Sequence, residues 1–344
     1  DRSPDIIEDQ VTYPITTALL GAPRVKAIRG FSDFGFSYVY VIFEDGTDMY
    51  WARTRVLEYL SKITQQLPPA VKVELGPDAS SVGWVFQYAL VDKTGKHSSD
   101  ELRSYQDWFL RYAVQSVPGV AEVATVGGQV RQYQVTVNPN LLVAFKIPLE
   151  TVIEAVRQGN NDVGGRLVEL SGREYMVRGR GYIKNIRDIE SIVLRSVDGT
   201  PVLIKDVATV ALGPELRRGV ADYNGQGDVV GGIVVMRSGE NALNVIGRIK
   251  AKLSDLGPSL PEGVDIVTTY DRSELIGRAI DTVTDKLIEE IIVVSIIILV
   301  FLWHFPSSIV PIITIPVSVA LAFIPMKLMG LNANLMSLAG IAIS

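Results

Sequence analysis

The sequence predicts a two-lobed α+β region, made of repeated βαβ units with an inserted subdomain, followed by all-α transmembrane helices. Three observations support this fold class. Charged residues are almost confined to positions before 291, a sequence pattern recurs after 193 residues, and the 36 residues from Ile291 to Met326 carry no charge. The first and third observations separate a charged part from an apolar part, and the second describes the fold of the charged part.

The charge distribution also excludes some classes of partner. All 38 acidic residues lie at or before Glu290, and of the 33 basic residues only Lys327 follows it. The charged part is mildly acidic with both signs interspersed, whereas a nucleic-acid-binding protein presents a basic face. We therefore expect no nucleic-acid partner. The absence of cysteine excludes disulfides and thiolate metal ligands.

The two ends of the sequence indicate a piece of a longer chain. The sequence begins at Asp1 without an initiator methionine or an apolar leader. At the other end, the 17 residues from Leu328 to Ser344 are uncharged. A soluble domain does not usually stop inside an apolar helix, so we expect that the chain is truncated at Ser344.

The uncharged run predicts two transmembrane helices. It is too long for one span of about 20 residues and suits two spans joined by a tight turn. Residues 303–308 are aromatic, small or polar, as expected at a membrane interface. We predict one helix at about Lys286–Trp303, a second at about Ile309–Met329, and a truncated third from about Asn334. The alternative is a buried hairpin in a large soluble core. The connection has no Lys or Arg, so the orientation stays open.

The recurring pattern describes a βαβ unit that occurs twice. Tyr40–Gly46 and Ile233–Gly239 each form an apolar strand that ends in a glycine turn. An amphipathic helix follows in each copy, with matching core positions at Val56, Leu60 and Ile63 and at Ile249, Leu253 and Leu256. A Leu-Pro pair at 67–68 and 260–261 then ends the helix, and a second strand reaches Val73 or Ile266.

Further elements are predicted between the two copies. A related unit consists of strand Trp84–Val91, helix Asp100–Ser116 with Leu102, Trp108 and Leu110 among its apolar positions, and strand Val120–Val126. The alternating segment Gln132–Val137 predicts an antiparallel strand with one solvated face. An insertion that ends near Val210 then contains helix Pro148–Gln158 and strands Arg166–Leu170, Tyr175–Arg178 and Ser191–Leu194.

These elements predict split βαβ lobes, an inserted α+β module between them that ends near Val210, and a return to the membrane at about Ile280. The insertion is rich in glycine and charge, which suits an exposed module for protein contacts or a loop decoration.

No catalytic or cofactor-binding constellation is present in the sequence. His97 lies in a predicted turn and His304 at a helix end, so a site that uses both is not expected. The Gly-Gly pairs at 127 and 164 lack the frame of a phosphate-binding loop. Asp48 is expected to favour a helix N-terminus. Glu289 and Glu290 are expected at the membrane interface, although a proton relay is the alternative.

Methionine is the soft ligand of interest, because thioether sulfur binds Cu(I) and similar ions. Met236 aligns with Phe43 in the repeat and is expected in a core. Met326 and Met329 end the second span and could face lipid. Met336 lies beside Asn332, Asn334 and Ser337, a polar run that is unusual for a lipid face. Both a packing role and a metal-relay role are open for Met336.

Short motifs along the whole chain resemble one family. They are Gly30–Gly35, Tyr38–Tyr40, Phe43–Asp48, Tyr50–Arg53, Leu75–Ala79, Gly213–Glu215, Arg217–Gly219, Thr268–Ser273, Gly330–Asn334 and Met336–Leu338. In this order they are similar to the heavy-metal branch of the resistance-nodulation-division efflux pumps. The resemblance is closest to the Cus-type copper/silver pump and next to the Czc-type cobalt/zinc/cadmium pump.

The resemblance implies a proton-driven, homotrimeric cation antiporter of the bacterial inner membrane, which is a secondary active transporter and not an enzyme. The resemblance implies that residues 1–79 form most of a first periplasmic porter subdomain, and that residues 80–126 and 215–275 form a second. It likewise implies a docking subdomain at 127–214 and transmembrane helices at 284–344. The expected partners are membrane lipid, a periplasmic membrane-fusion adaptor and an outer-membrane channel. The transported ion is Cu⁺ or Ag⁺, with Zn²⁺, Co²⁺ and Cd²⁺ as alternatives. No cofactor is implied.

The resemblance bears on single residues as well. Met336 matches a methionine that lines the relay path of the copper pump, so it is the candidate metal ligand of this sequence. The position after Gly213-Pro214-Glu215 is methionine in the copper pump and Leu216 here, which argues against a continuous methionine path. The proton-relay aspartate and the periplasmic three-methionine site of the family are implied to lie beyond Ser344.

Three other functions are weighed against metal efflux. A multidrug pump of the same superfamily needs an aromatic-rich pocket in the cleft of the porter region. A protein-export or assembly factor shares the plan of βαβ units and helices without carrying ions. A membrane-anchored binding module performs no transport. A metal-dependent growth phenotype separates metal efflux from all three.

Overall fold

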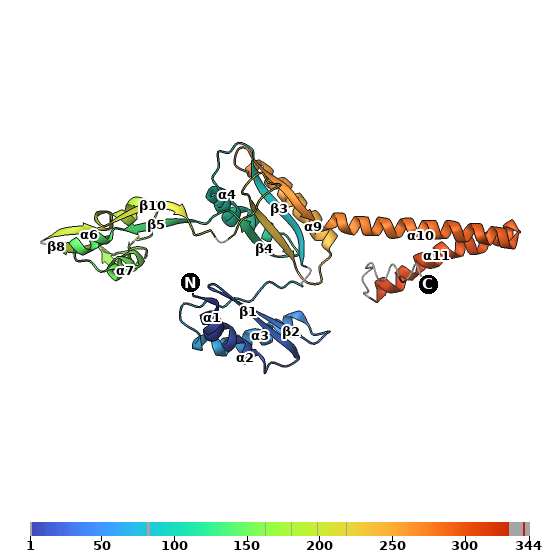
Figure 1. Cartoon of the computed structure of the whole chain (residues 1–344), viewed down its shortest axis with the longest axis horizontal. Coiled ribbons are helices and arrows are strands. Elements are labelled where there is room, and N and C mark those ends of the chain that lie inside the picture. Colours follow the sequence, from blue (N-terminus) through green and yellow to red (C-terminus); the bar gives the residue numbers. More distant parts are fainter. Residues whose placement is uncertain are drawn as a thin grey trace.

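A computed structural model describes residues 2–80, 83–161, 163–179, 181–197, 199–217, 219–329 and 340. Figure 1 shows an elongated molecule with two α+β lobes, an inserted module on one side and a long helical hairpin on the other. The first lobe comprises residues 2–76, and the second lobe comprises residues 83–127 and 221–271. The inserted module comprises residues 131–214.

The second lobe is built on a four-stranded antiparallel sheet with the order β12-β3-β11-β4. Two βαβ units interleave in this sheet, since β3 lies between β12 and β11, and β11 lies between β3 and β4. The elements are β3 (Trp84–Asp92), α4 (Ser99–Tyr105), η3 (Gln106–Leu110), α5 (Arg111–Gln115), β4 (Val120–Gly127), β11 (Val230–Met236), α9 (Ala242–Leu256), η5 (Gly257–Ser259) and β12 (Val264–Asp271).

Helix and strand side chains form one core in this lobe. Burial of each aliphatic or aromatic side chain contributes about 1.5–3 kcal/mol relative to exposure. Gly232 is required in β11, because a Cβ there would lie 2.5 Å from the ring of Tyr88. The buried residues include Val85, Phe86, Tyr88, Leu90, Leu102, Leu110, Val114, Val120, Val123, Val230, Val234, Val245, Ile246 and Ile249.

The helix between β3 and β4 contains a π turn, η3, that the sequence does not predict. Of the three apolar positions named in the predicted helix, Leu102 and Leu110 are buried, whereas Trp108 is 77% exposed. A π turn adds a residue to one turn and so shifts the spacing of core positions. Gln106 is buried instead, and its Oε1 accepts a hydrogen bond of 3.0 Å from the Tyr88 hydroxyl. Burial raises the pKa of Tyr88 to about 12.

The first lobe has a two-stranded antiparallel sheet, β1–β2, covered on one face by helices. Its core contains Leu19, Val56 and Leu60 from the helices, with Val39 and Val41 of β2 packed against them. The elements are α1 (Pro4–Ile7), η1 (Glu8–Thr12), α2 (Tyr13–Leu19), β1 (Val25–Asp33), β2 (Phe36–Phe43), α3 (Met49–Ile63) and η2 (Thr64–Gln66).

The predicted repeat is confirmed over its strand, turn and helix. An offset of 193 residues places α3 on α9 and η2 on η5 residue for residue. Gly46 and Gly239 both adopt the left-handed backbone, with φ of +79° and +86°. Asp48 and Asn241 both cap their helices by accepting a backbone N–H three residues later.

The second strand of the repeat is confirmed in one copy alone. In the second lobe it is β12, which pairs with β3. In the first lobe the predicted strand that ends at Val73 is wrong, because residues 71–77 have no regular secondary structure. A strand requires a neighbour for its backbone hydrogen bonds. Among the described residues of the first lobe, β2 pairs with β1, and no strand lies where β3 lies in the second lobe.

The inserted module starts and ends in the antiparallel pair β5–β10, and its two small cores lie beside this pair. Its antiparallel strand and its helix occur as predicted, whereas α6, α8, β9 and the pairing of β10 were not foreseen. The elements are β5 (Arg131–Val137), α6 (Pro139–Ala144), α7 (Leu149–Gly159), β6 (Val163–Leu170), β7 (Arg173–Gly179), α8 (Ile186–Glu190), β8 (Val193–Val197), β9 (Thr200–Leu203), η4 (Ile204–Asp206) and β10 (Ala208–Pro214).

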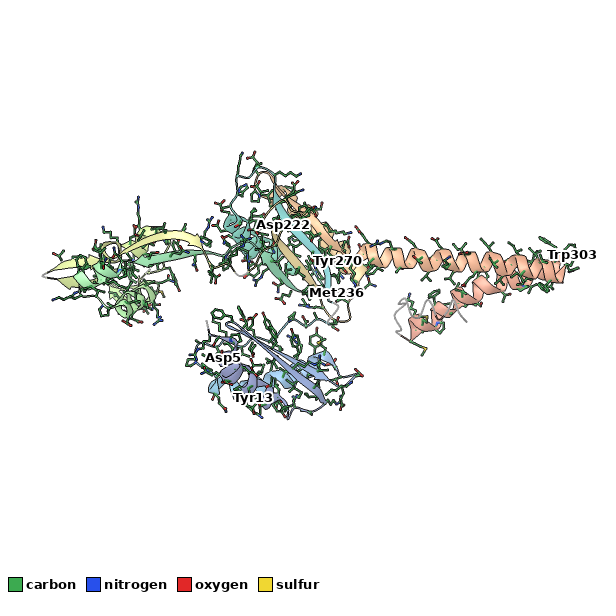
Figure 2. The ribbon with its side chains drawn as sticks, in the orientation of Figure 1. Asp5, Tyr13, Asp222, Met236, Tyr270 and Trp303 are labelled. Carbon is green, nitrogen blue, oxygen red and sulfur yellow. The ribbon has the colours of Figure 1, made fainter. Side chains whose placement is uncertain are left out.

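Two long helices form the hairpin, α10 (Arg272–Leu302) and α11 (Phe305–Leu328). Trp303 lies at its tip with a left-handed φ of 46° (Figure 2). The predicted start of the first helix near Lys286 is wrong, since the helix begins at Arg272. Hydropathy indicates where the apolar run begins, whereas the helix itself begins after its N-cap residue, Asp271. The third helix predicted from Asn334 lies outside the described residues.

Candidate functional site

Hard metal ligands do not cluster in the described part of the chain. No group of three or more His, Asp or Glu that could hold a metal ion occurs among the described residues. The backbone N–H of His97 donates to Asp92, and its Nε2 lies 3.1 Å from the carbonyl oxygen of Glu262. His304 Nδ1 lies 2.8 Å from Ser307 Oγ at the start of α11. Both histidines therefore have local structural partners.

Two acidic groups considered in the sequence also have local roles. Asp48 Oδ1 accepts the backbone N–H of Trp51 at 2.7 Å, as its predicted helix-terminal role requires. Glu289 Oε2 lies 2.7 Å from Lys286 Nζ, and both side chains are exposed. An exposed ion pair of this kind contributes little to stability. Neither group forms a buried acid site.

The thioether groups are distributed over several elements. Met49, Met176 and Met236 lie on α3, β7 and β11, and Met326 and Met329 lie at the end of α11. Met236 packs against the core of the second lobe, as the repeat predicts, and Figure 2 shows it at one end of that lobe. The candidate ligand Met336 lies outside the described residues, so its role stays a prediction.

Leu216 lies where the inserted module joins the second lobe. It lines a cavity of about 470 Å³ together with Arg103, Gly128, Glu215 and Arg217. Its side chain is 78% exposed. The guanidinium of Arg103 donates to the carbonyl oxygen of Gly127 at 2.7 Å and so fixes the end of β4. An aliphatic side chain here cannot bind a metal ion.

The first lobe contains an open cleft beside β2. The cavity is about 550 Å³ and is lined by aliphatic side chains of α1–α2, β2 and residues 70–76, with Phe36 as its single aromatic side chain. Residues 72–75 make no backbone–backbone hydrogen bond to another described residue. In the second lobe β3 occupies the equivalent place between β11 and β12. The cleft thus exposes apolar core and unpaired backbone, and Glu74 is the one carboxylate in its lining.

The outer face of β1–β2 is aromatic. Phe31, Phe36, Tyr38 and Tyr40 are about half exposed or more. Phe31 and Phe36 each have a ring centroid 6.4 Å from that of Tyr38. This is an open face of a sheet and not an enclosed pocket.

Helix α11 has the properties of a transmembrane helix. Among the described residues it is the one helix that is long and apolar enough to cross a membrane, with a mean hydropathy of 2.3. Three prolines interrupt its backbone hydrogen bonds, and Thr314 Oγ1 donates to the carbonyl oxygen of Val310 at 2.7 Å. Helix α10 carries Asp285, Lys286, Glu289 and Glu290 within the 18 residues that end at Leu302, so a complete first span is not confirmed.

The sequence matches a family of known proteins over nearly its whole length. The AcrB/AcrD/AcrF family matches residues 2–344. The chain is 56% identical over 344 residues to the putative cation efflux system protein SilA of Salmonella typhimurium, covering 100% of this chain and 33% of the relative. It is 55% identical to the cation efflux system protein CusA of Escherichia coli K12, with the same coverage. The chain thus spans about a third of the length of these relatives.

The fold also matches a solved structure. A crystal structure of a heavy metal efflux pump superposes with a TM-score of 0.88 at 32% identity, over 98% of this chain and 34% of that chain. The resemblance drawn from the motifs is therefore confirmed. The α+β lobes have the fold of the porter-like subdomains of these pumps.

Proposed function

Because the chain belongs to the AcrB/AcrD/AcrF family, we propose that it is part of an inner-membrane pump that exports heavy-metal cations. The main support is the match to two cation efflux proteins at more than half identity along the whole chain. As a secondary active transporter, the pump moves its substrate without covalent chemistry and is not an enzyme.

Cu(I) and Ag(I) are the proposed cargo. The support is the resemblance to the Cus-type pumps, together with Met336, whose thioether suits a soft monovalent cation. The described residues provide no cluster of hard ligands for Zn²⁺, Co²⁺ or Cd²⁺. Leu216 is the departure, since the copper pump has a methionine there. We propose that the ion passes this position without a protein ligand.

The energy source and the assembly follow the family. We propose a proton-driven antiporter that forms a homotrimer and binds a periplasmic adaptor and an outer-membrane channel. Residues 1–79, 80–126 and 215–275 serve as porter subdomains in the periplasm, and residues 127–214 as the docking subdomain. Figure 1 supports the last assignment, because the inserted module lies at the opposite end of the molecule from α10 and α11.

A multidrug pump is the alternative from the same superfamily. Such a pump binds organic molecules in an aromatic-rich pocket. The cleft of the first lobe has Phe36 as its one aromatic side chain, and the exposed rings of Phe31, Tyr38 and Tyr40 lie on the open β1–β2 face. The protein-export and binding-module alternatives predict no change in the cell's tolerance to metals.

The test is expression of the complete pump in a bacterial strain that lacks its own copper and silver exporters. We expect higher tolerance to Cu(I) and Ag(I), lower cellular metal, and unchanged tolerance to Zn²⁺ and to a cationic dye. Collapse of the proton gradient should abolish export from loaded vesicles. Higher dye tolerance without metal tolerance would favour the multidrug alternative, and no change in either would favour the non-transport alternatives.

The role of Met336 can be tested in the same strain. Met336→Leu keeps the volume and removes the ligand, so it should cost less than about 1.5 kcal/mol of stability. Copper and silver tolerance should fall while pump abundance holds. Met329→Leu is the matched control, because Met329 is 72% exposed at the end of α11. Equal tolerance of Met336→Leu and the unmodified pump would show that Met336 is a packing residue.

A further inference from the structure

The segment between the two lobes is held at Asp78. Asp78 Oδ2 accepts a hydrogen bond of 3.0 Å from the Tyr50 hydroxyl, which belongs to the first lobe at the start of α3. The same oxygen lies 3.3 Å from Arg237 Nε, which follows β11 in the second lobe. The carbonyl oxygen of Asp78 accepts the backbone N–H of Ser238 at 3.0 Å. One residue therefore contacts both lobes through its side chain and its backbone.

Other contacts hold the same segment on each side of Asp78. The guanidinium of Arg53 in α3 donates to the carbonyl oxygen of Gly76 at 2.7 Å. The N–H of Met236 donates to the carbonyl oxygen of Gly83 at 2.7 Å. The described helices and strands of the two lobes pack mainly against elements of their own lobe and make few contacts with each other. This segment is therefore the main described connection between the lobes.

The repeat relates Asp78 to a second aspartate. The offset of 193 residues places Asp78 on Asp271, the last residue of β12. The Asp271 carboxylate forms an ion pair with Lys250 of α9, and its side chain is 3% exposed. Its Oδ1 also accepts the backbone N–H and the hydroxyl of Ser273 at 2.8 and 2.6 Å, which caps α10. Asp271 thus joins the second lobe to the helix that leads to the membrane.

We propose that Asp78 and Asp271 are equivalent positioning residues, each of which fixes its βαβ unit relative to the next body of the chain. Asp78 sets the angle between the first and second lobes, and Asp271 sets the direction of α10 from the second lobe. A carboxylate suits this role, because two oxygen atoms accept several hydrogen bonds from different elements at once. A change of orientation at either residue is transmitted to a whole lobe or helix.

The titration of Tyr50 is consistent with the contact at Asp78. The hydrogen bond to Asp78 raises the pKa of the Tyr50 phenol, because it stabilises the protonated form. The exposure of Arg237 limits the strength of its ion pair. The contact is therefore suited to set an angle that remains adjustable during a transport cycle.

Spin-label distances in the complete pump test the proposal. The chain has no cysteine, so labels can be attached at exposed positions without a background from this region. Leu57 in the first lobe, Trp108 in the second lobe and Leu275 on α10 are all more than half exposed. One label pair is Leu57→Cys with Trp108→Cys, and the other is Trp108→Cys with Leu275→Cys. Labelled protomers are diluted among unlabelled ones in nanodiscs.

The two aspartates should act on different label pairs. We expect Asp78→Ala to broaden and shift the distance distribution between the lobes and to leave the second pair unchanged. Asp271→Ala should broaden and shift the distance distribution of the second pair and leave the first pair unchanged. Tyr50→Phe removes one hydrogen bond and is the milder variant, with a smaller broadening of the first pair. Asp255→Ala removes an exposed carboxylate of α9 and is the control.

An inter-lobe distribution that is unchanged in both Asp78→Ala and Tyr50→Phe would show that Asp78 does not set the angle. Hydrogen exchange within each lobe separates a hinge effect from unfolding, because the proposal requires unchanged protection of α3 and α9 in Asp78→Ala and Tyr50→Phe. Loss of that protection in Tyr50→Phe would assign Asp78 to the stability of a lobe instead. The test does not depend on the transported ion.

Discussion

The first and second lobes contain the same βαβ pattern but complete it differently. In the second lobe, β3 lies between the two strands of the repeated unit and closes a four-stranded sheet over one core. In the first lobe that place is an aliphatic cleft of about 550 Å³. The helix, the turn glycine and the cap are nevertheless equivalent. Local structure is therefore determined within the unit, whereas the sheet depends on a strand from outside it.

The largest expected difference concerns the matched leucines Leu60 and Leu253. Both are truncated by Leu→Ala, for which losses of about 2–5 kcal/mol are typical. Leu60 and Leu253 are 8% and 7% exposed, and each borders a cavity. Leu253, however, packs in the larger core, under the four-stranded sheet. We expect Leu253→Ala to cost about 4 kcal/mol and Leu60→Ala about 2 kcal/mol. Hydrogen exchange of α9 and α3 measures the two losses, and equal losses would show that the cleft is filled in the complete protein.

The next expected effect is the acid sensitivity of the second lobe at Asp271. Burial alone raises the pKa of Asp271, but hydrogen bonds from Lys250 and Ser273 outweigh burial and hold it below its usual value. A lowered native pKa gives stability that is present above the unfolded value of about 3.9 and is lost as the pH falls through the native pKa.

Asp271→Asn removes this contribution. The variant should be less stable at neutral pH and should lose less stability below about pH 4 than the unmodified protein. Denaturant unfolding at a series of pH values measures both effects. Lys250→Met should reduce the same pH dependence, since it removes one of the stabilising partners. If both variants lose stability with falling pH as steeply as the unmodified protein does, the acid sensitivity is due to other carboxylates.

A smaller loss of stability is expected when either helix cap is removed, and the loss should be equal in the two lobes. Asp48→Ala and Asn241→Ala each remove a side chain that accepts the backbone N–H of the third residue of its helix, at a cost of about 1 kcal/mol. Asp48→Asn should retain the cap, because Asn241 provides it in the second lobe. Exchange of the amides of Trp51 and Asn244 measures each cap. A large difference between the two alanine variants would show that the two caps have the same geometry but contribute different amounts to stability.

The smallest expected effect is at Trp108, which lies on the exposed side of the π turn. Trp108→Ala should change stability by less than about 0.5 kcal/mol, as is usual for an exposed position. Leu110→Ala is the comparison, since Leu110 is fully buried in the same turn. Denaturant unfolding of both variants provides the measurement. A large loss in Trp108→Ala would indicate that another part of the complete protein covers this surface.

The helices and caps of the repeat could be predicted because their signals are local. Gly46 permits the left-handed turn, and Asp48 accepts a hydrogen bond from a residue three positions away. The start of α10 at Arg272 was missed, although Asp271 is a cap residue of the same kind. Hydropathy indicates the boundary of the apolar segment, which lies C-terminal to the cap at Asp271.

The candidate site was less predictable than the fold. Methionine chemistry pointed to Met336, which lies outside the described residues. The sequence contained Asp78 and Asp271 at the repeat spacing, but spacing alone does not show that their carboxylates contact two bodies each. The offset of 193 residues was the signal that could have linked them.

The sequence by itself determined the first strand, the glycine turn and the capped helix of each repeat, and the apolar helix that follows, because each depends on residues a few positions apart. The tertiary structure decided the rest. Whether residues 71–75 form a strand depends on a neighbour that supplies hydrogen-bond partners, and the burial of Gln106 depends on the packing of η3 against β11. Asp78 becomes a joint between lobes because Tyr50 and Arg237, which are 187 residues apart, reach the same oxygen atom.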